Sequence, residues 1–295
     1  MARGRRGKNA RVRFGLIAFP IDWREAMALS QMADSIGFDS LWTGDHLRHP
    51  RDPTVGSLDG WSLLAGWAAS TERVHVGMLV SNLIYRHPVV LARETVAVDH
   101  ISNGRVEVGL GTGVFETDHA MAGVPVWSAG ERVARLGEAA EIMDGLLRGE
   151  LESFEGRFYH FEQAVMAPLP VQRPRPPIVI GATKPKTIRI TARWADTWNT
   201  FGGFGLDLGQ LNEAILAQID EVNRQCEALG RDPASLQRSL LAYPPHDPWA
   251  SDRAFEELVS TYDRLGFDEV IVYAPLPHQQ AAFERITTTL LPALR

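Results

Sequence analysis

The chain has 295 residues, of which 45% are hydrophobic and 22% charged, a balance typical of a globular protein with a sizeable core. A formal net charge of -6 at pH 7 argues against a general nucleic-acid-binding surface, and the single cysteine excludes an internal disulfide framework or a thiolate metal cluster. No apolar run reaches membrane-spanning length. We therefore expect a cytoplasmic protein that acts on a small molecule and has neither a nucleic-acid nor a membrane partner.

The first twelve residues are rich in arginine, and we predict that residues 1–12 form a flexible basic arm. From Arg13 onward, apolar strands alternate with amphipathic helices without a break. In chain order, the predicted elements are strand 13–19, a helix ended by Gly37, strand 38–44, helix 61–70, strand 74–80, helix 87–101, strand 105–110, helix 128–147, strand 177–182, a helix from 184, strand 196–201, helix 211–230, strand 235–244, a helix with Phe255, Leu258, Tyr262 and Leu265 on one face, strand 269–274 and a last helix to about 291.

Eight successive pairs of strand and helix favour a closed parallel barrel over an open doubly wound sheet. The sequence thus predicts an α/β fold in which residues 13–295 form a single (β/α)8 TIM barrel. The segment from Gly149 to Pro177 is aromatic early and proline-rich late, so we interpret it as an ordered insertion between the fourth helix and the fifth strand.

In such a barrel, functional residues lie at the carboxyl ends of the strands. This rule selects a set of polar and glycine residues that follow strands two to six: Asp45, His46, Ser81, Asn82, Arg86, the segment 111–119, the segment 181–183, Asn199, Gly202, Gly203 and Gly205. We expect the loops 46–60 and 244–249, with the segment 149–177, to determine the substrate.

The run of glycines at 109, 111 and 113 begins inside a predicted strand. The motif GLGTGV also has no glycine at its sixth position. Both features disagree with a dinucleotide-binding fingerprint. Without Cβ atoms, Gly111 and Gly113 would let the backbone approach a flat ring or a phosphate, and we favour this over a simple turn.

A second candidate cradle is the segment IGATKPKT, in which Gly181, Ala182 and Thr183 precede a helix. The exposed amides at a helix start favour an anion, and Lys184 and Lys186 lie nearby. The alternative is an ordinary helix cap formed by Thr183, and the motif leaves both open.

Among the titratable groups, Asp45 and His46 are the favoured catalytic pair, because histidine exchanges a proton near neutral pH. The alternative is a structural histidine below the loop. A metal site of His46, Glu116 and His119 is disfavoured, since the first strand ends in GLIAFP and lacks the His-x-His of barrel metallohydrolases. We therefore expect no metal.

Several motifs from residue 13 to about residue 200 together resemble the luciferase-like monooxygenase superfamily of flavin and deazaflavin enzymes. They are RHP at 86–88, SNGR at 102–105, GLGTG at 109–113, FETDHAMAGVP at 115–125, FEGRFYHFEQ at 154–163 and PIVIGATKPKTIRITARWADTWNT at 177–200. This resemblance implies a barrel that binds FMN or coenzyme F420 noncovalently at the carboxyl ends of its strands.

The run FDSLWTGDHL at 38–47 is most similar to the deazaflavin branch of that superfamily. The resemblance implies that His46 transfers a proton, that Asp45 is its neighbour and that Glu116 is a second acid near the ring. It also implies a cis peptide bond between Leu79 and Val80. The residues that it places against the cofactor are Leu79, Val80, Asn82, Gly111, Thr112, Gly113, Gly181, Ala182 and Thr183.

The resemblance therefore predicts an F420-dependent oxidoreductase that moves a hydride between the deazaflavin and a small organic substrate. One alternative is an FMN-dependent monooxygenase that consumes O2 and receives reduced flavin from a separate reductase, so that a flavin or F420 reductase would be a redox partner. Another is a barrel that binds the cofactor without catalysis. The resemblance also implies a homodimer.

Overall fold

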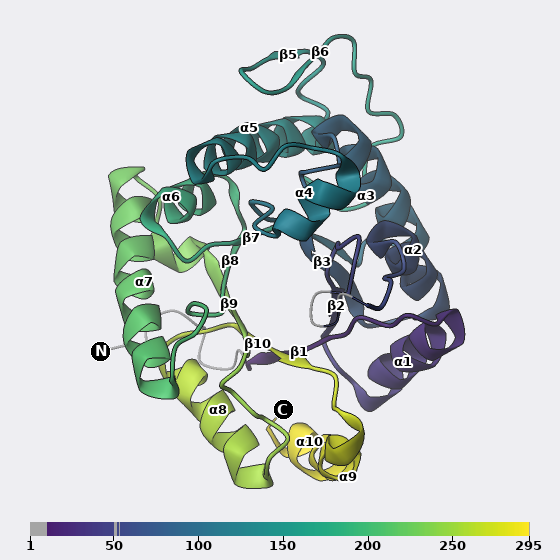
Figure 1. Cartoon of the computed structure of the whole chain (residues 1–295), viewed down its shortest axis with the longest axis vertical. Helices are drawn as coiled ribbons and strands as arrows, with labels where there is room; N and C mark the ends of the chain where they lie inside the picture. The colour runs from purple at the N-terminus through teal and green to yellow at the C-terminus, as the bar shows by residue number, and fades with distance from the viewer. Residues whose placement is uncertain (1–10, 50–51, 53, 295) are drawn as a thin grey trace.

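The computed structural model describes residues 11–49, 52 and 54–294. Eight parallel strands close into a barrel in the order β1-β10-β9-β8-β7-β4-β3-β2, and helices surround them (Figure 1). The strands of the barrel are β1 Arg13–Ile17, β2 Ser40–Thr43, β3 His75–Ser81, β4 Val106–Leu110, β7 Ile178–Gly181, β8 Thr197–Thr200, β9 Gln237–Leu241 and β10 Glu269–Tyr273. The predicted (β/α)8 barrel is confirmed. Residues 1–10 of the predicted basic arm lie outside the described residues.

The outer helices follow the strands in the predicted alternation. They are α1 Trp23–Ile36, α2 Gly60–Ser70, α3 Pro88–Ser102, α5 Ala129–Arg148, α6 Pro185–Trp194, α7 Leu208–Ala228, α8 Asp252–Arg264, α9 Gln280–Arg285 and α10 Leu291–Ala293. A π-helical turn at Ile286–Leu290 joins the last two. In the part of the chain that the structure describes, no helix is long and apolar enough to cross a membrane.

Side chains and glycines at the helix ends explain several of these boundaries. The carboxylate of Asp22 accepts hydrogen bonds from the backbone N–H groups of Arg24 and Glu25 at 2.9 and 3.0 Å, which caps α1. Gly37 ends that helix with φ 100°, a left-handed conformation that glycine adopts without a steric penalty.

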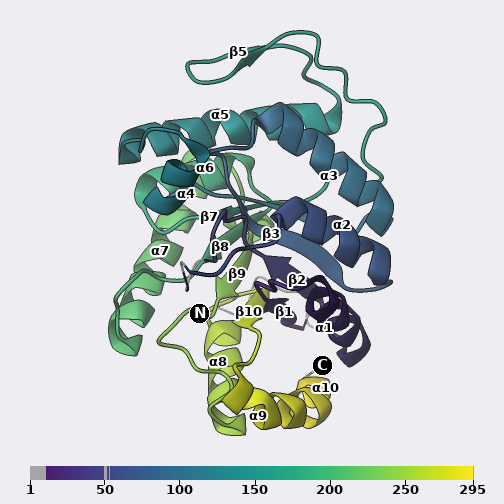
Figure 2. The same ribbon diagram turned by 45° about the vertical axis from the view of Figure 1, so that its right-hand side comes forward.

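Two elements lie outside the simple alternation. A short helix, α4 (Glu116–Ala122), follows β4 and lies inside the ring of the other helices (Figure 1). A two-stranded antiparallel sheet, β5 (Phe154–Glu155) and β6 (His160–Phe161), lies between α5 and β7 and projects beyond the ring (Figure 2). The carboxylate of Glu138 on α5 accepts hydrogen bonds from three successive backbone N–H groups, 157–159, at 2.9 to 3.1 Å, which fixes the hairpin to the barrel.

A layer of ionic groups fills the barrel where the strands begin. Arg13 Nη2 lies 2.6 Å from Glu107 Oε1 and 3.6 Å from Glu269 Oε1. Ser40 Oγ donates to Glu269 at 2.5 Å and accepts from Trp42 Nε1 at 2.7 Å. Burial alone would raise the pKa of Glu107, but the charge of Arg13 and the hydrogen bonds to Glu107 outweigh it and bring its pKa to about 2. Glu107 therefore stays ionised and paired.

Above this layer lies a small apolar cluster inside the barrel, separate from the core between strands and helices. Its buried members are Ile17, Trp42, Leu79, Val179 and Ile271, and the partly buried side chains packed against them are Phe19, Val80, Leu241 and Tyr273. We call the end where the eight strands have their carboxyl termini the barrel mouth. The four partly buried side chains form its floor.

β3 and β4 approach each other closely where they reach the mouth. The pairing register shifts between Met78 and Ser81, and the Leu79–Val80 peptide bond is cis, as predicted. A Cβ atom on Gly109 would lie 1.9 Å from the carbonyl oxygen of Met78, and one on Gly111 would lie 2.2 Å from Val80 Cγ2. The first two glycines of GLGTG are therefore required by the neighbouring strand, and the predicted contact of Gly111 with a ligand stays a prediction.

This close approach predicts that Gly109→Ala is strongly destabilising. The added methyl group would collide with backbone rather than with a movable side chain, so the free energy of unfolding should fall by about 3 kcal/mol or more. Urea denaturation of the purified protein measures the change. Gly181→Ala is the matched control: the nearest atom to its added Cβ would be 3.7 Å away, so stability should change by less than about 1 kcal/mol. Equal effects of the two substitutions would contradict the packing argument.

Candidate active site

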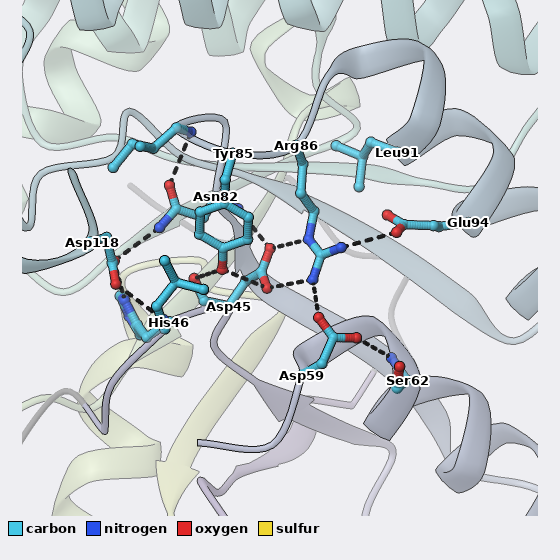
Figure 3. A network of polar contacts seen from close by, with 12 residues as sticks. Asp45, His46, Asp59, Ser62, Asn82, Tyr85, Arg86, Leu91, Glu94 and Asp118 are labelled. Carbon is cyan, nitrogen blue, oxygen red and sulfur yellow. Dashed lines mark hydrogen bonds and ion pairs between the residues drawn. The ribbon is translucent and has the colours of Figure 1, made fainter. Parts of the chain in front are cut away.

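His46 lies at the barrel mouth, three residues after the end of β2, and a buried carboxylate holds its ring. His46 Nδ1 lies 2.9 Å from Oδ2 of Asp118, which is 1% exposed (Figure 3). The same carboxylate accepts hydrogen bonds from the backbone N–H of Leu47 at 3.0 Å and from the amide Nδ2 of Asn82 at 2.9 Å. A carboxylate can only accept, so the neutral ring carries its proton on Nδ1. Nε2 is then the nitrogen able to take a proton.

Two aromatic rings flank His46. The ring of Phe115 meets it edge-on with 4.9 Å between centroids, and the centroid of Phe19 lies 6.4 Å away. The side chain of His46 is 19% exposed. These contacts limit the water around the imidazole while leaving part of it accessible from the mouth.

Asp45, the other half of the predicted pair, has a different role. Its carboxylate accepts two hydrogen bonds from the guanidinium of Arg86, at 2.6 and 2.9 Å, one from the hydroxyl of Tyr85 at 2.9 Å and one from the backbone N–H of Asn82 at 2.9 Å (Figure 3). Asp45 is 1% exposed. Because its acceptor sites are taken up by these groups, Asp45 fixes the loop that carries His46, and we assign it a positioning role.

Arg86 connects this loop to two helices. It also contacts Asp59, which caps α2, at 2.5 Å, and Glu94 on α3 at 2.9 Å. Burial alone would lower the pKa of Arg86, but the carboxylate of Asp45 outweighs that effect and the net shift is upward. Burial and the neighbouring charge of Asp45 both raise the pKa of Tyr85. Tyr85 therefore serves as a hydrogen-bond donor and not as an acid at neutral pH.

Asp118 lies in the segment 111–119 selected from the sequence, but no role was predicted for it. Glu116 was predicted as the second acid, whereas Glu116 is exposed in the first turn of α4 and Asp118, two residues later, is the group beside His46. The helix that carries Asp118, α4, has seven residues and ends at Gly123 with φ 67°. His119 is buried and packs edge-on against Trp127 with 5.1 Å between centroids. Among the described residues, no three His, Cys, Asp or Glu side chains converge as metal ligands.

Three of the predicted cofactor-contacting residues, Val80, Gly111 and Gly181, form a bare strand edge at the ends of β3, β4 and β7. The partly buried Val80 stands beside two glycines: Gly111, which has no room for a Cβ, and Gly181, where the nearest atom would be 3.7 Å from one. The chain's own packing therefore explains Gly111 and leaves room at Gly181 for a flat group against the backbone. Gly113 has φ 68°, and Thr112, between Gly111 and Gly113, is half-buried. This cradle fits a planar ring.

Two other predicted contacts have partners within the chain. Asn82 donates to Asp118 and accepts from the backbone N–H of Ile84 at 3.1 Å, so its amide braces the His46 site. Ala182 is 3% exposed, and its carbonyl accepts from Trp198 Nε1 at 2.8 Å.

The start of α6 differs from the helix cap considered above. The N-cap is Lys184, and the hydroxyl of Thr187 donates to the Lys184 carbonyl at 2.8 Å, so Thr183 is not the cap. Both Lys184 and Lys186 are exposed. An anion site at this helix start stays a prediction.

Comparison with known proteins gives consistent matches. The sequence matches the model of a family described as luciferase-like monooxygenase over residues 5–248. It is 27% identical to an F420-dependent glucose-6-phosphate dehydrogenase of Intrasporangium calvum over 92% of this chain and 95% of that protein. It is 34% identical to the oxygenase component of a flavin-dependent trigonelline monooxygenase of Acinetobacter baylyi, over 55% of this chain but only 44% of that protein.

Among solved structures, an F420-dependent secondary alcohol dehydrogenase in complex with an F420-acetone adduct superposes with a TM-score of 0.80, covering 97% of this chain and 99% of that chain. The two sequences are 16% identical, so this likeness concerns the fold.

The buried ion pair predicts that Asp45→Asn is strongly destabilising. The substitution leaves the buried guanidinium of Arg86 without its bidentate partner, which should lower the free energy of unfolding by about 3 kcal/mol. Chemical denaturation measures this. As a control, Asp252→Asn breaks a pair with Arg285 whose two side chains are 48% and 51% exposed, and it should leave stability nearly unchanged. A small effect of Asp45→Asn would show that Asp59 and Glu94 suffice to hold Arg86.

Proposed function

Because the chain belongs to the luciferase-like monooxygenase family, we propose that it is an oxidoreductase that uses coenzyme F420 to move a hydride to or from a small organic substrate. The observation that carries the proposal is His46, held by Asp118 at the same end of the barrel as the bare strand edge of Val80, Gly111 and Gly181. A relative that is similar over nearly its whole length is named as F420-dependent, which supports the choice of cofactor.

When bound, the deazaflavin accepts or donates a hydride, and the protein supplies orientation and proton management. Val80, Gly111 and Gly181 would hold the ring, with Thr112 and Gly113 beside it. The exposed amides at the start of α6, with Lys184 and Lys186, would suit the anionic part of the cofactor.

Oxidation of an alcohol releases a proton as well as a hydride, so the site needs a base. His46 takes this proton on Nε2, because Nδ1–H is held by Asp118. The Asp118 carboxylate then stabilises the positive charge of the imidazolium, as in other carboxylate–histidine pairs. In the reverse direction the same nitrogen returns the proton.

A second candidate is an FMN-dependent monooxygenase supplied with reduced flavin by a separate reductase. The similarity to a flavin-dependent oxygenase component over 55% of this chain favours it. It would consume O2, whereas a deazaflavin reacts poorly with oxygen. The paired arrangement of His46 and Asp118 speaks against a barrel that binds a cofactor without catalysis.

The proposal includes a cytoplasmic homodimer and, for the redox cycle, a flavin or F420 reductase as partner. The family resemblance supports the dimer and the reductase. A single cysteine in 295 residues supports a reducing compartment.

Fluorescence titration of the purified protein with F420 and FMN in parallel tests the choice of cofactor. We expect F420 to bind at least about tenfold more tightly than FMN. Gly181→Ala, which is expected to have little effect on stability, should weaken F420 binding because its methyl group would occupy the space left for the ring. Tighter binding of FMN, with O2 consumption, would favour the second candidate.

Replacement of His46 tests the proton transfer. His46→Ala should lower turnover by about a hundredfold or more, as expected for loss of a general base, while F420 affinity stays nearly intact. Asp118→Asn should lower turnover less, because the imidazole remains but loses the negative charge that stabilises its protonated form. Steady-state kinetics and F420 titration of each variant separate the two effects. His160→Ala, an exposed histidine on β6, is the control, and unchanged turnover of His46→Ala would refute the assigned role.

A further inference from the structure

The half of the barrel mouth opposite the bare strand edge is lined with aromatic side chains. We call this group the aromatic arc; its members are Phe19, Phe201, Phe204, Tyr243 and Tyr273. They come from the ends of β1, β8, β9 and β10 and the loops that follow, four strands that are neighbours in the barrel.

Packing against the apolar cluster places the arc at the mouth. Tyr273, at the end of β10, and Phe19, two residues beyond the end of β1, both pack against that cluster. Tyr243 lies beyond the end of β9, and its ring contacts the ring of Tyr273.

The rings of the arc are in continuous contact. Centroid separations are 6.4 Å for Phe19 and Tyr273, 6.1 Å for Tyr273 and Tyr243, 5.5 Å for Tyr243 and Phe201, and 4.6 Å for Phe201 and Phe204. Phe204 is 58% exposed. Phe19 also adjoins His46, so the arc begins at the proposed base and leads away from it. An apolar surface of this kind beside a reactive group suits the body of an organic ligand.

The loops that carry the arc have no basic side chains other than His246 and His278. The segments 18–22, 201–207, 242–251 and 274–279, all of them described, have neither lysine nor arginine. Their carboxylates include Asp22 and Asp207, which cap helices, and Asp247, which accepts a hydrogen bond from Gln279 at 2.8 Å. Burial lowers the pKa of His246 to about 4, so this ring is uncharged at neutral pH.

We propose that the aromatic arc binds the substrate, and that the substrate is an uncharged alcohol or carbonyl compound with an apolar, ring-containing body. Phosphate and carboxylate groups are recognised by arginine, lysine or helix amides, and the arc offers acidic caps instead. A phosphorylated sugar, the substrate named for the relative from Intrasporangium calvum, does not suit this surface.

The redox step of this inference rests on the proposed function. In the direction of oxidation, the carbinol C–H bond breaks with its electron pair, which leaves as a hydride to oxidised F420. The hydroxyl proton passes to His46 Nε2, and the carbon–oxygen double bond forms. The reverse step reduces the carbonyl compound.

Isothermal titration of the full-length protein, with and without F420, tests the substrate class by binding alone. The probes are 1-phenylethanol and mandelate, which share a phenyl ring and a secondary alcohol but differ by a carboxylate, together with glucose 6-phosphate. We expect 1-phenylethanol to bind at least about tenfold more tightly than mandelate and glucose 6-phosphate to give no measurable binding.

Variants of Phe204 locate the binding to the arc. Phe204→Ala should weaken 1-phenylethanol binding about fivefold while F420 affinity is unchanged. Phe204→Arg should bring mandelate and 1-phenylethanol to within about threefold of each other, because it adds the missing cation. Leu216→Ala, on α7 and 48% exposed, removes an exposed apolar side chain outside the arc and should change neither the 1-phenylethanol affinity nor the F420 affinity.

The inference is overturned if mandelate or glucose 6-phosphate binds as tightly as 1-phenylethanol. It is also overturned if 1-phenylethanol does not bind, or if Phe204→Ala and Leu216→Ala behave alike. If the expected preference holds but F420 does not bind, the arc is supported and the proposed cofactor fails, so the two failures are distinguishable.

Discussion

The position of His46 depends on two buried carboxylates that require partners. A carboxylate removed from water is stable only when hydrogen bonds and opposite charges replace its hydration. Asp45 obtains them from Arg86, Tyr85 and a backbone N–H, which ties the loop after β2 to the loop after β3. Asp118 obtains them from His46, Asn82 and another backbone N–H, which ties α4 to the same place. The imidazole is thereby oriented before any ligand arrives, so less free energy is needed to order it during reaction.

The glycines at the mouth serve two separate demands. Gly109 and Gly111 make room for the irregular part of β3, where a side chain on either would meet Met78 or Val80. Gly181 has no such neighbour, so packing within the chain does not require a glycine there, and in the proposed function this space receives the cofactor ring. Gly109 and Gly111 thus allow β3 and β4 to pack closely, and Gly181 on β7 leaves space beside Val80. The aromatic arc completes the mouth on the other side, with His46 at the boundary.

The sequence was sufficient for the barrel because its strand and helix periodicities alternate strongly over nearly the whole length. With the barrel known, the rule that function lies at strand carboxyl ends brought His46 and the glycine segments to one rim. The role of Asp118 was not predicted because α4 has only seven residues, too few for a helical pattern to be evident. The burial of Asp45 depends on Arg86, 41 residues away, and no local pattern records such a pairing. The aromatic arc was not predicted either, because Phe19 and Tyr273 become neighbours only when β1 pairs with β10 and the barrel closes.

The ionic layer of Arg13, Glu107 and Glu269 lies at one end of the barrel and the aromatic arc at the other, with the apolar cluster between them. A substitution in the arc therefore leaves every contact of the ionic layer in place. In a lineage of such proteins, the rim can diversify by single steps and acquire new specificities while the folded state is retained. The residues that stabilise the folded state and the residues whose replacement can change specificity thus lie at opposite ends of the barrel.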